Sequence, residues 1–269
     1  MSRGQIARVH APLHRSYALQ PAVDHRRVTL HSGQVQLWAV HLTASDSVTR
    51  AYRALLPPEE AARAGRFVFE HLQRSYCVSR GALRLLLSRY LNSKPRELEF
   101  EFGPYGKPAL RDGSRLRFNM SHSGDLALYA FALDCEIGVD VEAVRPIPGI
   151  EGLAASFCCA AETEELSSLS GTDRFVPGFF RCWTRKEAYI KAVGKGLSFP
   201  LDQVQVTLLM GTAPRFLQLG TQPEEAAAWS LHHLEPAPGY VGALAYRGAA
   251  RVAHLDAAVE AQELLDRFA

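Results

Sequence analysis

Apolar and polar positions along the chain predict a mixture of strands and amphipathic helices. In 35–42 (VQLWAVHL), Val35, Leu37 and Ala39 occupy alternate positions, which is the period of a β-strand. From His71 to Tyr90, apolar residues recur every three or four positions, which is the period of an amphipathic helix. By the same criteria, further strands are predicted at 98–102, 117–120, 126–133, 137–142, 204–209, 229–234 and 240–246, and further helices after Pro58 and at 163–169, 179–193 and 257–268.

The order of these elements predicts a two-lobed α+β protein, because each half contains a long helix and several strands. Residues 1–30 mix His, Arg, Pro and Gln without a sustained period, and we expect a loosely held arm there. We assign the N-terminal lobe to 31–135 and the C-terminal lobe to 136–247. Residues 248–269 are assigned to a C-terminal tail that is helical.

Composition excludes several classes of protein. With 269 residues, 47% of them hydrophobic and 22% charged, the chain is neither collagen-like nor generally disordered. Its net charge of +2 argues against a nucleic-acid coat, and no apolar run approaches the roughly 18 residues of a membrane span. The N-terminus lacks the apolar core of a secretory signal. Five cysteines without a C-x-x-C pair predict reduced, buried thiols in a cytoplasmic protein.

The strand predicted at 137–142 (IGVDVE) places two carboxylates on one face. Asp140 and Glu142 share that face with Gly138, about 7 Å apart at roughly 3.3 Å per residue. Two such carboxylates repel unless a cation lies between them, and Mg²⁺ takes oxygen ligands of this kind. Gly138 is expected to leave space for a ligand. The alternative, a solvated strand face, is the commoner origin of so short a pattern.

The helix predicted at 179–193 carries a second set of candidate functional residues along one face. Trp183, Glu187 and Lys191 recur every four residues and therefore lie along one face. The plain interpretation is an exposed Glu–Lys pair one turn apart. Because Trp183 begins the same stripe, a packed face is the other interpretation, in which Glu187 supplies a base or metal ligand and Lys191 neutralises a phosphate.

The segment 118–124 (FNMSHSG) is predicted to run from a strand into a polar turn. Its hydroxyls, histidine and glycine are suited to an anion-binding corner, and the alternative is a polar turn that only caps a hairpin. Ser121 and His122 are neighbours on opposite faces, so they do not form a nucleophile–base pair, and a serine hydrolase is disfavoured. On the first long helix, Arg80 and Arg84 share a face that is either solvated or a phosphate clamp.

Four short motifs follow one another along the chain: G-K-P at 106–108, F-N-M-S-H-S-G at 118–124, G-V-D-V-E at 138–142 and W-T-R-K-E-A-Y-I-K-A-V-G-K-G-L at 183–197. Together they resemble the signature motifs of 4′-phosphopantetheinyl transferases of the larger, surfactin-synthetase-activating type, over about residues 35–245. The resemblance implies an α+β fold of two similar, pseudo-duplicated lobes in one chain, each with a long helix packed on a small, mostly antiparallel sheet.

The resemblance also implies a reaction and its residues. Such enzymes transfer 4′-phosphopantetheine from coenzyme A to a serine of an apo acyl or peptidyl carrier protein, with Mg²⁺, and release adenosine 3′,5′-bisphosphate. The metal ligands fall on Asp140, Glu142 and Glu187, and the catalytic residues on Glu187, Lys191 and His122, with Glu187 as the base for the carrier serine. Coenzyme A binding is assigned to Arg74, Gly106, Lys107, Pro108, Asn119, Ser121, His122 and Lys191.

The partners implied are coenzyme A and a transient carrier protein, with a monomeric enzyme in the cytoplasm and no nucleic acid or membrane. Carrier proteins of this class are acidic, so the docking surface must be a local basic patch, for which the helix around 181–186 is a candidate. Two other functions remain open: a Mg²⁺-dependent phosphohydrolase or nuclease that uses the same carboxylates, and a coenzyme A or carrier-protein binding module without chemistry.

Overall fold

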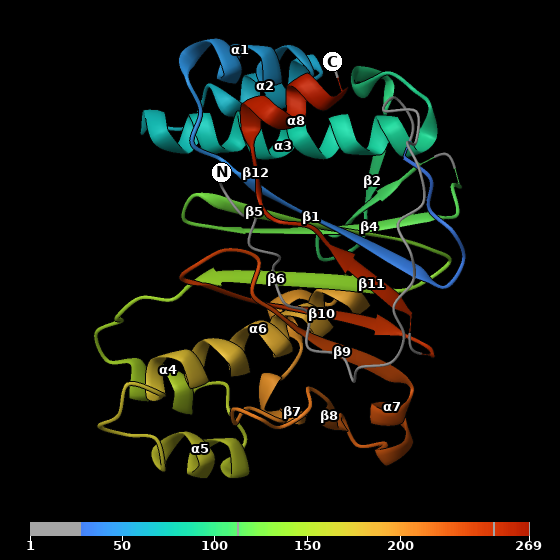
Figure 1. The fold of residues 1–269 in the computed structure, drawn as a ribbon. Coiled ribbons are helices and arrows are strands. Elements are labelled where there is room, and N and C mark those ends of the chain that lie inside the picture. The colour runs from blue at the N-terminus through green and yellow to red at the C-terminus, as the bar shows by residue number, and fades with distance from the viewer. Residues whose placement is uncertain (1–27, 112, 250, 269) are drawn as a thin grey trace, which may run out of the picture.

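Two β-sheets lie one above the other in the computed structural model, which describes residues 28–111, 113–249 and 251–268 (Figure 1). Most of the predicted arm, 1–30, lies outside the described residues. The strands of the first sheet follow the order β11-β1-β5-β4, with β12 also paired to β1, and those of the second follow β6-β10-β9. The strand bounds are β1 Gln34–His41, β4 Leu116–Ser123, β5 Leu126–Leu133, β6 Ile137–Ala143, β9 Trp229–Leu234, β10 Tyr240–Arg247, β11 Val252–Leu255 and β12 Val259–Glu260.

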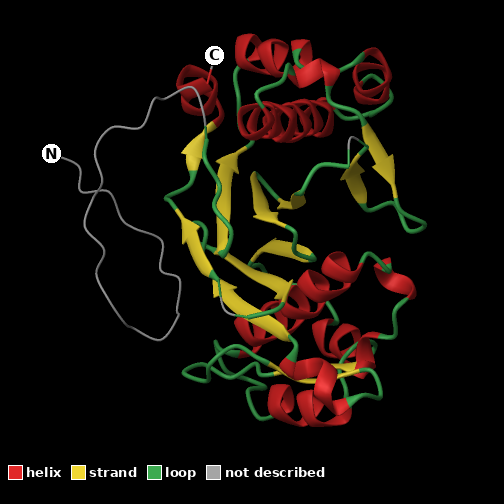
Figure 2. Ribbon diagram, turned by 90° about the vertical axis from the view of Figure 1, so that its right-hand side faces the viewer, coloured by secondary structure: helices red, strands yellow, loops and turns green. Residues whose placement is uncertain are grey.

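A long helix covers the outer face of each sheet, so the layers run helix, sheet, sheet, helix (Figure 2). Helix α3 (Glu70–Leu91) packs on the first sheet together with α1 (Asp46–Ala54) and α8 (Ala261–Phe268), and α2 (Pro58–Ala64) packs on α3. Helix α6 (Phe175–Val193) packs on the second sheet. The remaining elements are α4 Ile150–Ala155, α5 Ala160–Ser167, α7 Pro223–Ala227, the hairpins β2 Phe100–Phe102 with β3 Pro108–Leu110 and β7 Val204–Val206 with β8 Phe216–Leu219, and three short 3₁₀ helices.

Apolar side chains fill the space between the two sheets and beneath each helix. Leu37 and Leu128 from the first sheet meet Val139 and Leu244 from the second in one buried cluster. Val139 comes from the apolar face of β6, so its other face, which carries Asp140, is turned toward α6. The mixed α+β class expected from the sequence is therefore confirmed. Within the described residues, no helix combines the length and the apolar character needed to cross a bilayer.

The elements differ from the sequence-based expectations in several places: α1, α4, α7, β3, β8, β11 and β12 were not predicted, and several bounds differ, of which those of β4, α6 and α8 matter most here. β4 continues through Ser123 instead of ending at Met120, because Ser121 and Ser123 remain paired with Leu128 and Leu126 of β5. The predicted polar turn at 121–124 is therefore wrong, and 121–123 belong to the strand. Helix α6 begins at Phe175, about one turn earlier than expected, and α8 begins only at Ala261.

Helix α8 starts late because the residues before it extend the first sheet. β11 and β12 both pair in parallel with β1, so residues 252–260 form the outer edge of that sheet. The hydroxyl of Tyr52 donates to the main-chain oxygen of Ala261 at 2.8 Å, which ties the start of α8 to α1. The division of the chain at 135/136 and at 247/248 stays a prediction.

Gly138 allows α6 to lie directly on β6. A Cβ atom at Gly138 would stand 2.0 Å from the main-chain oxygen of Ala188 and 2.4 Å from the main-chain nitrogen of Ala192. The space beside Gly138 is therefore filled by helix backbone, and the expectation that it leaves room for a ligand is wrong. The close approach brings the polar residues of β6 within reach of those on α6.

Candidate active site

Strand β6 and helix α6 bring a carboxylate and an ammonium group together. Asp140 lies in mid-strand and is only 3% exposed, so the solvated strand face considered for it is excluded. Its Oδ1 lies 2.6 Å from Nζ of Lys191, one turn beyond Glu187 on α6. The sequence-predicted residues of the strand and of the helix thus face each other across the β6–α6 contact.

Ser121 of β4 completes a triangle with Asp140 and Lys191. Its hydroxyl donates to Asp140 Oδ1 at 2.7 Å and accepts from Lys191 Nζ at 2.8 Å. The second oxygen of Asp140, Oδ2, is buried and has no hydrogen-bond partner among the described residues, and the same holds for Oε1 of Glu187. Buried carboxylate oxygens without partners are costly, and a cation would satisfy them.

Burial raises the pKa of two carboxyl groups of this cluster, Glu187 and Glu142. Burial, and next the charge of Asp140, raise the pKa of Glu187 to about 7, against the opposing charge of Lys191. Burial also raises the pKa of Glu142, although the hydroxyl of Ser123 favours its ionised form. Both shifts favour the protonated carboxyl groups, chiefly because the groups are buried and next because they lie near Asp140.

Alternate residues of β4 reach from the first sheet to β6. The side-chain oxygen of Asn119 accepts from the main-chain nitrogen of Val139 at 2.9 Å. Ser123 donates to Oε2 of Glu142 at 2.5 Å. The hydroxyls of Ser121 and Ser123 thus both bind carboxylates. The segment is therefore neither a polar turn that caps a hairpin nor a free anion-binding corner.

His122 lies on the opposite face of β4 and is exposed. The atoms packed around its ring, and next the charge of Lys191, lower its pKa, so the ring is neutral at pH 7. Its assignment to the 3′-phosphate of coenzyme A stays a prediction.

Lys107 lies in a tight turn and reaches the main chain of β6 and α6. The turn is closed by Gly106, at a φ of +82°, and by a 2.9 Å bond from the main-chain nitrogen of Gly103 to the oxygen of Lys107. Nζ of Lys107 donates to the main-chain oxygens of Ile137 and Ala192 at 3.0 and 2.6 Å. Burial lowers its pKa to about 8. Lys107 and Pro108, the first residue of β3, line a cavity of about 380 Å³.

Three arginines of α3 pair with carboxylates. Arg74 pairs with Asp46 and Glu70 at 2.5 and 2.6 Å, at the start of the helix. Arg80 and Arg84 both pair with the buried Glu60 of α2, at 2.8 and 2.6 Å. The face that Arg80 and Arg84 share is therefore neither solvated nor a phosphate clamp, and it fastens α2 to α3.

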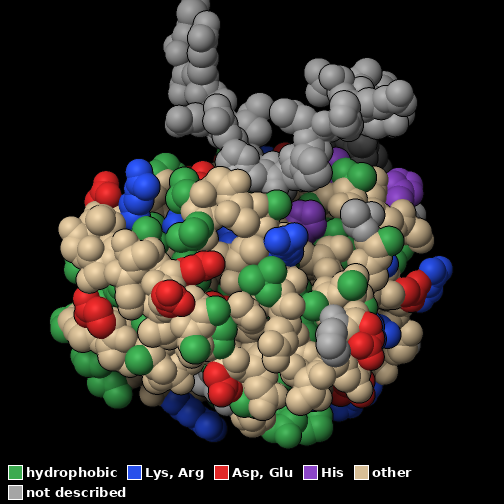
Figure 3. Space-filling model, turned by 90° about the horizontal axis from the view of Figure 1, so that it is seen from below, with side chains coloured by type: hydrophobic (Ala, Val, Ile, Leu, Met, Phe, Trp, Pro, Cys, Tyr) green, Lys and Arg blue, Asp and Glu red, His purple; other side chains and the backbone are tan. Residues whose placement is uncertain are grey.

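The basic patch expected around 181–186 is absent from the surface. Arg181, Arg185 and Lys186 are 6%, 2% and 0% exposed, because α6 turns these side chains toward the segments packed against it. Lys186 pairs with Glu162 at 2.6 Å, and Arg185 donates to the main-chain oxygen of Thr207. On the face below α5, β8 and α7, Lys and Arg side chains stand apart and gather into no patch (Figure 3). The docking surface proposed there is wrong.

A second group of candidate ligands lies under α5. The ligand atoms of Cys158, Glu162 and Cys182 are within 4.8 Å of one another, and among the described residues the carboxylates of the first site form no group this tight. Glu162 already binds Lys186 and accepts from the main-chain nitrogens of Cys159 and Val206. Its oxygens are satisfied, so this group is a packed ion-pair centre. All five cysteines are free thiols, as expected.

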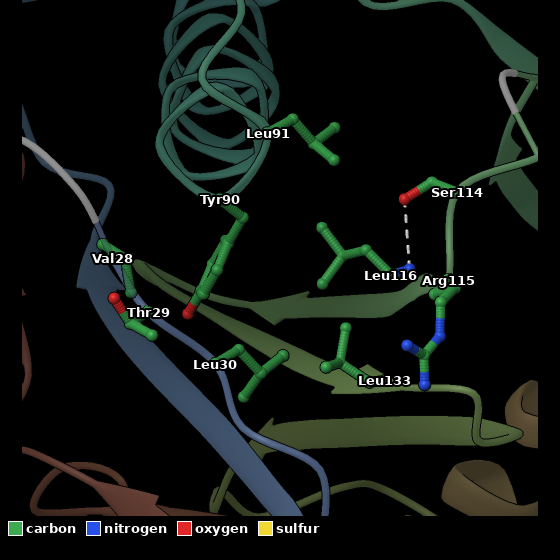
Figure 4. Close-up of a pocket in the computed structure, with 9 residues that line it drawn as sticks. All are labelled: Val28, Thr29, Leu30, Tyr90, Leu91, Ser114, Arg115, Leu116 and Leu133. Carbon is green, nitrogen blue, oxygen red and sulfur yellow. Dashed lines mark hydrogen bonds between the residues drawn. The ribbon is translucent and has the colours of Figure 1, made fainter.

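A cavity of about 440 Å³ lies apart from these residues, between the end of α3 and the first sheet (Figure 4). Tyr90 and Leu91 from α3 face Leu116 and Leu133 from the sheet. The predicted site residues do not line it; its lining is Val28, Thr29, Leu30, Tyr90, Leu91, Ser114, Arg115, Leu116 and Leu133.

Sequence reasoning missed Ser123. The signal was present, because Asn119, Ser121 and Ser123 alternate as the side chains of one strand face do. The expectation of a turn at 121–124 hid that alternation.

Comparison with known proteins agrees with this architecture. The 4′-phosphopantetheinyl transferase superfamily matches residues 136–245, and the N-terminal domain of 4′-phosphopantetheinyl transferases matches residues 43–133. The HetI 4′-phosphopantetheinyl transferase of Nostoc is 39% identical over 82% of this chain and 91% of its own. A putative transferase of Synechocystis is 40% identical over 64% of this chain and 69% of its own. The Sfp transferase of Bacillus subtilis is 30% identical over 61% and 71% respectively.

The fold and the matched families define a group-transferring enzyme. More narrowly, the chain belongs to the 4′-phosphopantetheinyl transferases, of the type represented by Sfp.

Proposed function

We propose that this transferase moves 4′-phosphopantetheine from coenzyme A to a serine of an apo acyl or peptidyl carrier protein, in a Mg²⁺-dependent reaction that releases adenosine 3′,5′-bisphosphate. The observation that carries the proposal is the buried pair of Asp140 and Glu187, each with an unpartnered oxygen, beside the ammonium group of Lys191. Its context is a family whose named members carry out this class of transfer.

The donor set fits Mg²⁺. Asp140, Glu142 and Glu187 offer only carboxylate oxygens, which hard divalent cations prefer, and two of these oxygens lack a protein partner. When bound, Mg²⁺ neutralises negative charge on phosphate oxygens and on the carboxylates. A phosphohydrolase or nuclease has the same metal chemistry, but the matched families favour the transferase.

Glu187 and Lys191 have the properties that the transfer requires. The oxygen of the carrier serine attacks the phosphorus that bears pantetheine, and the bond from that phosphorus to the bridging oxygen of the pyrophosphate breaks. Glu187 accepts the serine proton directly or through a water. Lys191 is 28% exposed and neutralises or protonates the departing bisphosphate.

The nucleotide end of coenzyme A is assigned to the first lobe. We assign the exposed His122 to the 3′-phosphate, and Arg74 and the turn at Gly106 and Pro108 to other parts of coenzyme A. The contacts favour a different role for two of the assigned residues. Asn119 and Lys107 hold main-chain groups of β6 and α6, so we infer that they join the lobes.

Three further points belong to this proposal. The enzyme acts as a monomer, since all the residues of the cluster come from one chain. It acts in the cytoplasm, where its five free thiols stay reduced. Its two lobes arose by duplication, which is supported by the repeated arrangement of a long helix on a sheet.

The test is intact-protein mass spectrometry of several apo carrier proteins incubated with the enzyme, coenzyme A and Mg²⁺. We expect a mass gain of one phosphopantetheine, lost with EDTA and reduced at least 100-fold in initial rate by Glu187→Gln, since a positioned base contributes roughly that much. The matched control is Glu164→Gln, an exposed glutamate of α5. Cleavage of coenzyme A without carrier gain would favour the hydrolase. Binding without cleavage would favour the binding module.

A further inference from the structure

The two sheets are joined beside the active site by a row of side chains from one strand. β4 pairs through its backbone with β5, and β6 pairs with β10, so β4 and β6 share no main-chain ladder. Asn119, Ser121 and Ser123 cross the gap instead, to Val139, Asp140 and Glu142 in turn. The residue numbers increase in the same order on both strands, so each of these β4 side chains has its own partner on β6.

The last residue of this row has a hydroxyl with a fixed direction. The main-chain nitrogen of Ala143 donates to Oγ of Ser123 at 3.2 Å, which occupies an acceptor position of that oxygen. The hydroxyl proton is then directed to Oε2 of Glu142, at 2.5 Å. Ser123 therefore fastens the carboxylate of Glu142 to the backbone of its own strand, through a residue of the other sheet.

Without this bond, Glu142 would be the least constrained carboxylate of the cluster. Asp140 is held by Ser121 and Lys191 and is 3% exposed, and Glu187 is 8% exposed on a packed helix. Glu142 is half-buried near the end of β6. The hydrogen bond donated by Ser123 orients this carboxylate.

We propose that Ser123 is a positioning residue, which holds Glu142 in the orientation that allows it to share a divalent cation with Asp140 and Glu187. The inference rests on the proposed function, in which these carboxylates bind Mg²⁺. Groups that hydrogen-bond to a metal ligand orient it, and their loss typically weakens metal binding about 10–100-fold. Ser123 touches neither the metal nor the substrate, so its effect appears in metal affinity.

The test measures direct binding of Mn²⁺, which also prefers oxygen ligands, by electron paramagnetic resonance of the purified full chain without substrates. We expect Ser123→Ala to raise the Kd for Mn²⁺ about 10-fold or more. Ser123→Thr keeps the hydroxyl and is expected to restore most of the affinity. The matched control is Ser230→Ala on β9, whose hydroxyl donates to the main-chain oxygen of Gly248 at 3.1 Å.

A second readout separates positioning from general loss of structure. In carrier modification, Ser123→Ala should raise the Mg²⁺ concentration for half-maximal rate while the rate at saturating Mg²⁺ falls less. Ser123→Cys, which preserves volume but donates weakly, should behave similarly if the alanine variant does not fold. Unchanged Mn²⁺ affinity in Ser123→Ala and Ser123→Cys would overturn the inference. Failure of the wild-type chain to bind Mn²⁺ would overturn both this inference and the proposed metal dependence, whereas binding without transfer would overturn the proposed function alone.

Discussion

At Glu187, burial and the nearby charge of Asp140 favour the neutral carboxyl group, with a pKa of about 7. The cost of ionising it is a property of the folded chain, because the unfolded chain exposes this side chain to water. A group whose pKa is raised by folding stabilises the native state at low pH, and that contribution disappears as pH rises through the folded value.

Glu187→Gln is therefore expected to stabilise the metal-free protein at high pH. Between pH 4.5 and about 7, wild-type Glu187 stays protonated in the folded state, and above about 7 it must ionise within the cluster. We expect the variant to gain Tm at pH 8, by about 2–4 °C for each kcal/mol of relief, and to lose that advantage near pH 4.5. Calorimetry in EDTA measures both, with Glu164→Gln as the control. An equal gain at both pH values would show that ionisation is not the cause.

The candidate site was predictable from the sequence at the level of residue type and spacing. The strand period placed Asp140 and Glu142 on one face, and the helix period placed Glu187 and Lys191 on another. The partners of other charged residues were not predictable, because they come from distant segments. Lys107 finds the main-chain oxygen of Ala192, for example, and no local pattern encodes that contact.

Between elements, the decisive contact is the close packing of α6 on β6. It requires a residue without a side chain at Gly138, since a Cβ there would overlap the helix backbone at Ala188 and Ala192. Backbone atoms cannot turn aside as a flexible side chain can. The contact at Gly138 therefore sets the distance between the strand carboxylates and Glu187. Gly138 is the residue next to Asp140 on the same face of β6.

Gly138→Ala is expected to destabilise the protein by about 3 kcal/mol or more, because the added methyl group would force β6 and α6 apart. The control is Gly152→Ala in α4, where nothing lies within 4 Å of the added Cβ. That change is expected to be neutral or stabilising by up to about 1 kcal/mol. Urea unfolding followed by circular dichroism measures both, and a Gly138→Ala protein as stable as wild type would contradict this packing.

The type of each major element was predictable because hydrophobic periodicity is local. The helix predicted at His71–Tyr90 is α3, within one residue at each end. β4 was cut short in the prediction because Ser121 and Ser123 are polar, and their partners on β6 lie about twenty residues away. In the sequence alone, polar strand residues that bind a second sheet cannot be distinguished from the polar residues that begin a turn.

At the scale of the whole molecule, the chain returns to its first sheet after completing the second. β11 and β12 pair with β1, and α8 packs on α3 and β1, although more than 200 residues separate β1 from these segments. The sequence identified a helix near 257–268 but not this docking, because short strands such as β12 carry too few residues to show a period.

Leu264→Ala is expected to destabilise the protein by about 2–5 kcal/mol, because Leu264 is fully buried between α8 and the first lobe. Gln262→Ala, on the same helix but exposed, should change the unfolding free energy by less than about 0.5 kcal/mol. Thermal unfolding of the two variants measures the difference. Equal Tm values would mean that α8 adds nothing to the lobe.

The return of 252–268 to β1 has a consequence for synthesis. Until these residues leave the ribosome, β1 has β5 on one side and an open edge on the other. The roughly 120 residues made in the interval take on the order of 10 s at typical elongation rates. For that time the nascent chain presents an unpaired strand to its neighbours, so the synthesis of residues 252–260 decides when this edge of the sheet stops being vulnerable to aggregation.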